Sequence, residues 1–331
     1  MQEYLVDMLC CPVCHEELSW SIEKKLDDHV EVGVAACEGC GASYPIRDGI
    51  GLFLTDELER EDLWEDVDSA LAQHLREHPE LDAKLLKVPL GALGPADQLF
   101  RAMILEERGD FAGAELAEDR AHEGLYTQDY MRCWGSQVDT LIEAVKDSDN
   151  PIVDLASGRC YLVGKLIGQT SAPIIASDFS PRVLRRNRRW LQFKGYYDRV
   201  SLLAFDARKT PFKDHSIETL TTNLGVPNIR GTGELFLELR RIVSGRFLAI
   251  SHFLPEDDGN GEVIEQFELG DAVYKARLVE KMSAAGFDVD TGVSCVGKAS
   301  PTPVGVVMEG MPVDGLPVER TEYEWCVVVG K

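Results

Sequence analysis

The amino-acid sequence predicts an α/β protein in which a doubly wound, mostly parallel sheet follows a small metal-binding unit and a helical connector. Two observations carry this prediction. Residues 151–180 run as an apolar segment, a turn of small residues, a helical segment and a second apolar segment, which is how an open parallel sheet begins. Two Cys-x-x-Cys pairs near the N-terminus have the spacing of a tetrahedral thiolate site.

The composition is strongly acidic. The 331 residues carry a formal net charge of −23 at pH 7, a balance that disfavours a simple electrostatic grip on nucleic acid. No apolar run has the length of a membrane span and no signal-peptide pattern is present, so we expect a cytoplasmic protein without a membrane partner. Nine cysteines in a reducing compartment predict metal binding rather than disulfides. The sequence does not predict an oligomeric state.

The first predicted unit, residues 1–54, contains the candidate metal site. Cys11 and Cys14 form one Cys-x-x-Cys pair, and Cys37 and Cys40 form the other. Each pair supplies two thiolates from one tight turn, and two such turns complete a tetrahedral site. We therefore expect these four cysteines to bind one structural Zn²⁺ ion.

Residues 55–127 form the second predicted part, an acidic and mostly helical connector. Its first apolar residues recur at helical spacing, at Leu58, Leu63, Trp64, Val67, Leu71 and Leu75. Prolines and glycines divide the remainder into shorter pieces. The acidic side chains either form a solvated face or belong to a helical lid over an active site, and the sequence leaves both interpretations open.

The third part, residues 128–331, opens with a helix and then a turn of small residues. Asp154 ends the first strand, Ala156-Ser157-Gly158 follow, and Asp178 ends the second strand. Small residues let the backbone touch a ligand where strand and helix meet, and an acid at the second strand's tip can accept hydrogen bonds from both hydroxyls of a ribose. The turn lacks the G-x-G-x-x-G frame of a dinucleotide site. A tight corner without a ligand is the alternative interpretation.

This stretch resembles the acid-x-Gly-x-Gly-x-Gly pattern of S-adenosylmethionine-dependent methyltransferases, with Ala156, Gly158 and Cys160 at the three glycine places. The resemblance implies a seven-stranded, doubly wound Rossmann-like methyltransferase sheet whose last strand is antiparallel, and S-adenosylmethionine as the cofactor. The cofactor-binding residues that it implies are Asp154, Ala156, Ser157, Gly158, Asp178, Phe179, Asp206, Ala207 and Asn223.

The resemblance also assigns roles to the polar residues at the strand tips. Asp154 orders the turn, Asp178 binds the ribose, and Asp206 accepts the exocyclic amine of adenine. Asn223 and His252 follow the fourth and fifth strands and are the candidate catalytic residues beside the methyl group. His252 is either a general base or a structural histidine.

The N-terminal unit resembles the small zinc-ribbon activator subunits of tRNA and release-factor methyltransferases. The residues that carry this resemblance are Leu9-Cys10-Cys11-Pro12-Val13-Cys14 and the tail Tyr44-Pro-Ile-x-Asp-Gly-Ile50 after the second cysteine pair. Those subunits cover an apolar face of a separate catalytic chain, so here the cover would be supplied in cis. A bacterial ribosomal-RNA guanine methyltransferase family has the same order, but ten acids and three bases over residues 1–54 make a poor surface for phosphate.

A basic face follows the second strand. Arg182, Arg185, Arg186 and Arg189 recur at i, i+3, i+4 and i+7 of a helix that begins at Ser180-Pro181. The face either binds the phosphates of RNA or pairs with the acidic connector inside the protein. We expect the second.

The function that the sequence predicts is S-adenosylmethionine-dependent methyl transfer to a small molecule or a protein side chain. Asn223-Leu-Gly-Val-Pro-Asn228 is not the Asn-Pro-Pro-aromatic signature of enzymes that methylate adenine or glutamine amines. RNA methylation is one alternative. Another is a non-catalytic partner-binding module with a degenerate cofactor site, which Ala156 and Cys160 favour and the retained acids oppose. Tyr126 and Tyr130 either border the cofactor or pack on the sheet, and a proline-containing insertion before the last strand either lines the substrate pocket or contacts the ribbon.

Overall fold

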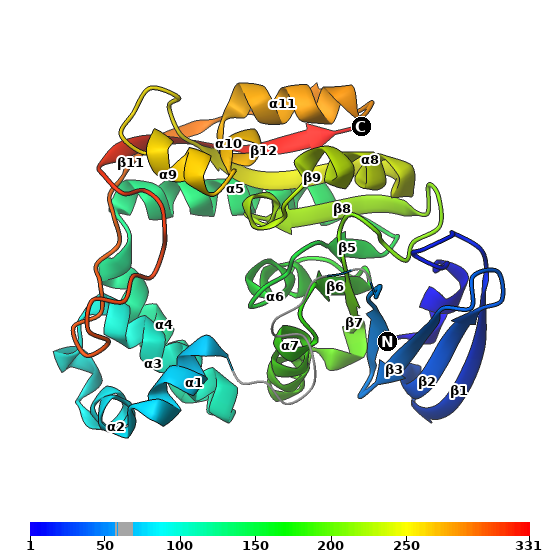
Figure 1. Cartoon of the computed structure of the whole chain (residues 1–331), viewed down its shortest axis with the longest axis horizontal. Helices are drawn as coiled ribbons and strands as arrows, with labels where there is room; N and C mark the ends of the chain where they lie inside the picture. Colours follow the sequence, from blue (N-terminus) through cyan, green and yellow to red (C-terminus); the bar gives the residue numbers. More distant parts are fainter. Residues whose placement is uncertain (57, 59–68) are drawn as a thin grey trace.

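The computed structural model describes residues 1–56, 58 and 69–331, so the predicted helical positions Leu63, Trp64 and Val67 lie outside the described part. The described strands form one twelve-stranded sheet in the order β1-β2-β3-β4-β7-β6-β5-β8-β9-β12-β10, with β11 paired to β12 (Figure 1). The class is the predicted α/β class, but the sheet is larger than seven strands.

Seven of these strands form the predicted methyltransferase-like sheet. They are β5 (Ile152–Asp154), β6 (Ile174–Asp178), β7 (Val200–Phe205), β8 (Ile217–Asn223), β9 (Val243–Phe253), β10 (Val289–Asp290) and β12 (Thr321–Gly330). Strands β5 to β9 are parallel neighbours, and β12 is antiparallel to β9, as predicted. The chain crosses from β7 to β8 on the far side of β5. The carboxyl ends at this reversal are where open α/β sheets bind ligands.

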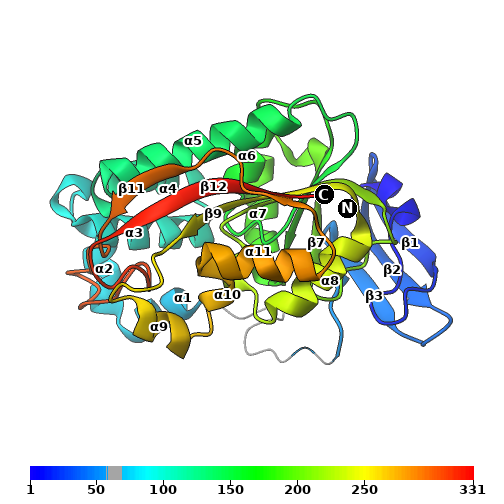
Figure 2. The same ribbon diagram turned by 90° about the horizontal axis from the view of Figure 1, so that it is seen from above.

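Helices cover both faces of the sheet (Figure 2). One face carries α5 (Gln128–Val145), α6 (Tyr161–Ile167) and α7 (Pro181–Lys194); the other carries α8 (Thr232–Ile242) and α11 (Lys275–Ala284), with the short α9 (Gly261–Gln266) and α10 (Gly270–Val273) nearby. Helix α7 begins where the sequence predicts, because Ser180 accepts a hydrogen bond from the Val183 N–H and Pro181 occupies the first turn.

The N-terminal unit is joined to this sheet rather than placed beside it. It contains a 3₁₀ turn (Glu3–Asp7) and the antiparallel strands β1 (Leu18–Leu26), β2 (His29–Cys37), β3 (Ser43–Arg47) and β4 (Ile50–Phe53). Strand β4 pairs in parallel with β7, with Leu52 opposite Ala204. Strand β7 would otherwise be an edge with unpaired N–H and C=O groups, and its pairing with β4 adds four of the five additional strands; β11, paired with β12, is the fifth.

The N-terminal residue is part of this junction. Met1 is fully buried, and its α-amino group donates hydrogen bonds to the Gly49 and Val30 carbonyls. Burial lowers the pKa of this amine to about 5. Next to it, Arg188 of α7 pairs with Glu31 of β2 at 2.7 Å, which fixes the ribbon to the helix layer.

The connector forms a separate small core. It contains α1 (Ala70–Glu77), α2 (Pro79–Lys87), a 3₁₀ turn (Leu90–Ala92), α3 (Pro95–Arg108) and α4 (Phe111–Leu125). The buried residues of this core include Leu75, Leu85, Phe100, Ile104 and Met308. None of the described helices combines the length and the apolar character that crossing a bilayer requires.

The insertion before β12 contacts the connector and not the ribbon. Strand β11 (Cys295–Ala299) forms a hairpin-like pair with β12, and the chain between them then reaches α3. There the buried Asp97 carboxylate accepts hydrogen bonds from the N–H groups of Val306, Val307 and Met308 at 2.9–3.1 Å. A disulfide joins Cys133 of α5 to Cys295, whereas composition predicted metal binding rather than disulfides.

The basic face of α7 pairs with the connector, as predicted. Arg182 lies 3.4 Å from Glu107, Arg186 lies 3.7 Å from Glu106, and Arg189 donates to the Glu107 carbonyl. These pairs place α3 against α7, so the basic face is used inside the protein.

Candidate active site

The turn between β5 and α6 has a left-handed backbone at every second residue. The φ angles are +52° at Ala156, +50° at Gly158 and +59° at Cys160. Glycine adopts this conformation without a steric penalty, whereas alanine and cysteine pay about 1 kcal/mol or more each. These three residues occupy the glycine positions of the acid-x-Gly-x-Gly-x-Gly pattern. The pattern therefore has glycine at the positions where the backbone has φ > 0. The Cys160 side chain is fully buried in the α5–α7 core and does not enter the cavity.

Asp154 supports this turn from behind. Its main-chain carbonyl accepts hydrogen bonds from the hydroxyls of Ser157 and Ser177, both at 2.9 Å, and its carboxylate accepts one from Thr221 at 2.9 Å. Burial raises the pKa of Asp154 to about 7, and the hydrogen bonds from Ser157 and Thr221 oppose this rise. Asp154 thus orders the turn and does not line the cavity.

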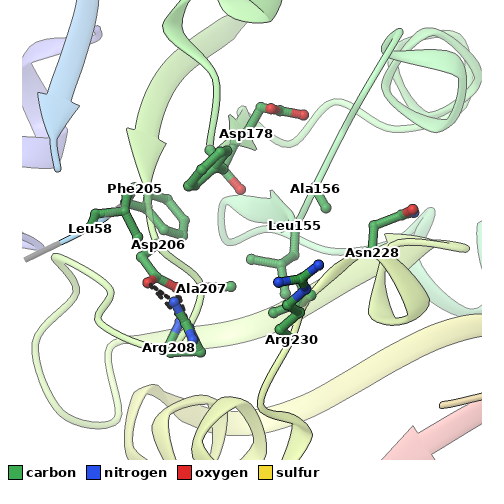
Figure 3. A pocket seen from close by; sticks show the side chains of 13 residues that line it. Leu58, Leu155, Ala156, Asp178, Phe205, Asp206, Ala207, Arg208, Asn228 and Arg230 are labelled. Atoms are coloured by element: carbon green, nitrogen blue, oxygen red, sulfur yellow. Dashed lines mark hydrogen bonds and ion pairs between the residues drawn. The ribbon is translucent and has the colours of Figure 1, made fainter. Parts of the chain in front are cut away.

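A cavity of about 710 Å³ lies at the carboxyl ends of β5, β6 and β7 (Figure 3). This volume falls within the range of small-molecule and cofactor sites. Its lining residues are Leu58, Leu155, Ala156, Ser177, Asp178, Phe179, Phe205, Asp206, Ala207, Arg208, Asn228, Ile229 and Arg230. The predicted residues Ala156, Asp178, Phe179, Asp206 and Ala207 are thus brought together. Leu58 is the lining residue from the described part of the connector.

Asp178 faces the cavity with a carboxylate that the turn holds in place. Its oxygens accept hydrogen bonds from the Gly158 N–H at 3.1 Å and the Ser180 N–H at 2.9 Å. Burial raises the pKa of this carboxyl, while these two N–H groups and Arg186 oppose the rise. Gly158 therefore contributes to the site through its backbone, and Ser157 through the hydrogen bonds that hold the turn.

Asp206 lies at the end of the neighbouring strand and is paired with a residue that the sequence analysis did not identify. The Arg208 guanidinium donates to its carboxylate at 2.7 and 3.0 Å. Arg208 could have been identified from its position two residues after Asp206, the predicted adenine-binding residue. Asn228 and Arg230, from the segment after β8, complete this end of the cavity. No sequence motif identifies these two residues.

Asn223 and His252 do not line this cavity. The Asn223 side-chain carbonyl accepts a hydrogen bond from Trp134 Nε1 at 3.0 Å, and Trp134 stacks on Tyr161 with ring centroids 4.5 Å apart. His252 instead lies among aromatic rings. Burial lowers the pKa of its imidazole to about 4, so it is neutral at pH 7 and a weak general base.

Tyr130, His252, Tyr323 and Trp325 form an aromatic cluster. His252 stacks on Tyr323 at 4.3 Å and meets Trp325 edge-on at 4.8 Å, and Tyr130 meets Trp325 edge-on at 4.9 Å. Three buried polar atoms here, His252 Nδ1, Tyr323 OH and Trp325 Nε1, have no hydrogen-bond partner among the described residues. The sequence signal for this cluster was the alternation of Tyr323 and Trp325 along β12, with Trp325 opposite His252.

The four predicted metal ligands come together in the ribbon. The Sγ atoms of Cys11, Cys14, Cys37 and Cys40 all lie within 4.8 Å of one another. Cys11 lies 3.5 Å from Cys40, and Cys14 lies 3.4 Å from Cys37. Zinc–sulfur bonds of about 2.3 Å in a tetrahedron require sulfur–sulfur distances of about 3.8 Å, so this donor set fits a zinc ion.

Two family models match the chain. Residues 2–49 match the Trm112p-like protein model, and residues 126–256 match the ubiE/COQ5 methyltransferase family model. The ubiquinone/menaquinone biosynthesis C-methyltransferase UbiE of Marinomonas sp. strain MWYL1 is 22% identical over 236 residues, covering 70% of this chain and 88% of that protein. The protein of the same name from Pseudomonas aeruginosa strain LESB58 is 28% identical over 116 residues, covering 34% of this chain and 45% of that protein.

Solved structures of methyltransferases are also among the matches, at low similarity. Geranyl diphosphate C-methyltransferase from Streptomyces coelicolor A3(2) is 13% identical, with a TM-score of 0.45, over 61% of this chain and 81% of that chain.

Proposed function

Since this chain is an S-adenosylmethionine-dependent methyltransferase with a Trm112p-like N-terminal domain, we propose that it methylates a small, neutral molecule with a flat hydroxylated ring. Asp178 binds the ribose hydroxyls of the cofactor, and Asp206 with the Ala207 backbone binds the adenine. The turn from Ala156 to Gly158 holds the methionine end. S-adenosylmethionine supplies an electrophilic methyl group, and the protein orients the acceptor toward it.

The observation that supports this acceptor is the aromatic cluster with its three unpartnered polar atoms. A buried polar group without a hydrogen bond costs about 1–3 kcal/mol, so three such groups within one ring cluster can be satisfied by the polar groups of a ligand. Tyr323 and Trp325 can donate to a ring oxygen, and the neutral His252 can accept from a ring hydroxyl. The four rings carry no charge, and the carboxylates of Asp314 and Asp258 act on Tyr323 from nearby, which disfavours an anionic molecule; the rings favour a flat one.

The names of the curated relatives suggest which atom accepts the methyl group. They are named as C-methyltransferases, so we propose a ring carbon beside the hydroxyl as the acceptor. A hydrogen bond from the hydroxyl to His252 increases the electron density of that carbon. This role requires an acceptor at Nδ1 and does not require His252 to be protonated.

The test is Tyr323→Phe, which removes only the unpartnered hydroxyl. With a panel of hydroxylated aromatic rings and a labelled cofactor, we expect KM for the acceptor to rise about tenfold, as for the loss of one hydrogen bond. The Kd of the cofactor should be unchanged, and the melting temperature should not fall. Tyr4→Phe is the control, because its hydroxyl is also buried but lies in the ribbon. Equal KM values in wild type and Tyr323→Phe, or no cofactor binding by the wild type, would refute the proposal.

We also propose that Cys11, Cys14, Cys37 and Cys40 hold one structural zinc ion. Elemental analysis should find about one zinc per chain, and Cys37→Ser should lose it together with much of the ribbon's stability. Cys10→Ser is the matched control, since Cys10 is buried and precedes Cys11 directly but does not belong to the four-thiol cluster. A full zinc content in Cys37→Ser would contradict the assignment.

A further inference from the structure

The acid assigned to adenine already has a partner within the protein. Arg208 Nε and Nη2 donate to the two Asp206 oxygens at 3.0 and 2.7 Å, and the Arg208 N–H donates to Oδ1 at 2.9 Å (Figure 3). Asp206 is 7% exposed, and both residues line the cavity. The hydrogen bond to Asp206 is also the main reason that the pKa of Arg208 is raised.

This pairing conflicts with adenine recognition. A carboxylate offers about four lone-pair positions, and Arg208 occupies positions on both oxygens. The exocyclic amine of adenine needs one of the same oxygens from the cavity side. Three N–H groups of Arg208 already donate to these oxygens, so the amine competes with the guanidinium for an acceptor position and gains strength when the guanidinium moves away.

We propose that Arg208 is a specificity-determining residue that competes with the adenine amine for Asp206, so that cofactor binding exchanges the ion pair for a base contact. The proposal rests on the assignment of Asp206 to adenine. This competition makes the cavity selective for adenine. A base replaces the hydrogen bonds that Arg208 gives up when its exocyclic amine can donate to Asp206. A purine without that amine leaves the ion pair closed.

The structure offers Arg208 a second partner when it moves. Its Nη1 atom and the Glu234 carboxylate lie 3.6 and 3.5 Å from the position that a Cβ atom at Gly231 would occupy. Glu234 also contributes to the raised pKa of Arg208. Arg208 is about one-third exposed, so a rotation from Asp206 toward Glu234 does not require repacking of the core.

The test measures binding of S-adenosylhomocysteine to the full chain by calorimetry. This probe has no net charge, which avoids long-range attraction by the acidic protein. Arg208→Gln should bind it about three- to tenfold more tightly than the wild type, the range expected for removing an ion pair with one partly exposed partner. Arg208→Lys, which cannot form the bidentate pair, should fall between the two. Arg230→Gln removes a charge from the same cavity without contacting Asp206 and should not bind more tightly.

A double-mutant cycle identifies the cause. In an Asp206→Asn background, Arg208→Gln should no longer tighten binding, because the competition is gone. The inference is overturned if Arg208→Gln weakens binding, leaves it unchanged, or tightens it equally in both backgrounds. The proposed function fails separately, if the wild type does not bind the probe at all.

Discussion

Asp154 lies behind the turn between β5 and α6 and is 1% exposed, and burial raises the pKa of its carboxyl group to about 7. In the unfolded chain the same group has a pKa near 3.9. Between about pH 4 and pH 7 the native state therefore holds a proton that the unfolded state has lost. The stability contributed by this group falls as pH rises through that interval and is constant above it.

Asp154→Asn should remove this pH dependence. Relative to the wild type, the variant should become more stable as pH rises from about 4 to about 7, by at most about 4 kcal/mol, and the difference should then level off. Thr221 can still donate to the amide oxygen, so the turn keeps a partner. Denaturant unfolding across pH 4.5–8 measures the difference. A constant difference at all pH values would show that Asp154 is not protonated in the native state.

His252 has the opposite linkage. Its pKa is about 4 in the folded protein and about 6.5 when unfolded, so below about pH 6.5 the unfolded state takes up a proton first. Native stability should therefore fall as pH drops from 6.5 toward 4, and His252→Gln should reduce this loss. NMR titration of the imidazole provides the direct measurement. A pKa near 6.5 for His252 would contradict the buried, neutral state.

At the scale of elements, two arginines link the connector to the turn between β5 and α6: Arg186, which lies 3.7 Å from Glu106, and Arg159, which makes the shorter pairs. Arg159 lies between Gly158 and Cys160 in the turn and pairs with Glu106 of α3 at 3.0 Å and Glu118 of α4 at 2.6 Å. Its side chain is 26% exposed and that of Glu106 is 9% exposed. The charges are thus largely removed from water, and each depends on its partner.

Arg159→Met should lower the free energy of unfolding by about 2 kcal/mol, because it leaves the poorly solvated Glu106 carboxylate with the longer Arg186 pair and removes the Arg159 pair of Glu118. Arg120→Met is the control, since the Arg120–Glu123 pair of α4 is more than half exposed and should be worth less than about 1 kcal/mol. Guanidinium unfolding is unsuitable because it screens charge, so urea is used. Equal effects of the two substitutions would show that the Arg159 pairs contribute no more than an exposed ion pair.

The elements differ in how well the sequence predicts them. Helix α7 is local: Ser180-Pro181 starts it, and its arginine spacing predicts one basic face. The partner of that face could be expected from charge alone. The parallel pairing of β4 with β7 was not predicted, because it joins segments about 150 residues apart and depends on which sheet edge is open. The anchoring of residues 306–308 on Asp97 is also non-local and has no sequence motif.

The candidate site shows the same division. Asp178, Asp206 and the small-residue turn follow a pattern that can be read along the chain, and the structure brings them to one cavity. The aromatic cluster assembles from α5, β9 and β12, which are far apart in the sequence. Its unpartnered polar atoms can be recognised only in the three-dimensional structure. Arg208 is adjacent to a predicted residue, but its competition with a ligand depends on side-chain geometry.

At the scale of the whole molecule, the ribbon and the cavity proposed for the cofactor share a strand. Strand β7 pairs with β4 on one side, and its next residue is Asp206. Disturbing the junction should therefore weaken cofactor binding as well as folding. Gly51 of β4 is the most direct place to test this, because a Cβ atom there would lie 2.8 Å from Leu203 and Phe53 side-chain atoms and 3.2 Å from Met1 Sδ.

Gly51→Ala should lower stability by about 1–3 kcal/mol through overpacking and should weaken cofactor binding in the same variant. Gly91→Ala in the connector is the control, because nothing lies within 4 Å of its Cβ position. Thermal unfolding and calorimetry measure the two effects. Normal stability in Gly51→Ala would mean that the junction can open around the added methyl group.

The parallel pairing of β4 with β7 within one chain also changes how the protein responds to dilution. A cover on a separate subunit is lost below the dissociation constant of the pair, and its supply has to match that of the catalytic chain. A tethered cover meets its strand at a fixed effective concentration, which no change in protein level alters. The fraction of molecules with a closed sheet edge is therefore set by a folding equilibrium within a single molecule, and specific activity should be the same at nanomolar and micromolar enzyme.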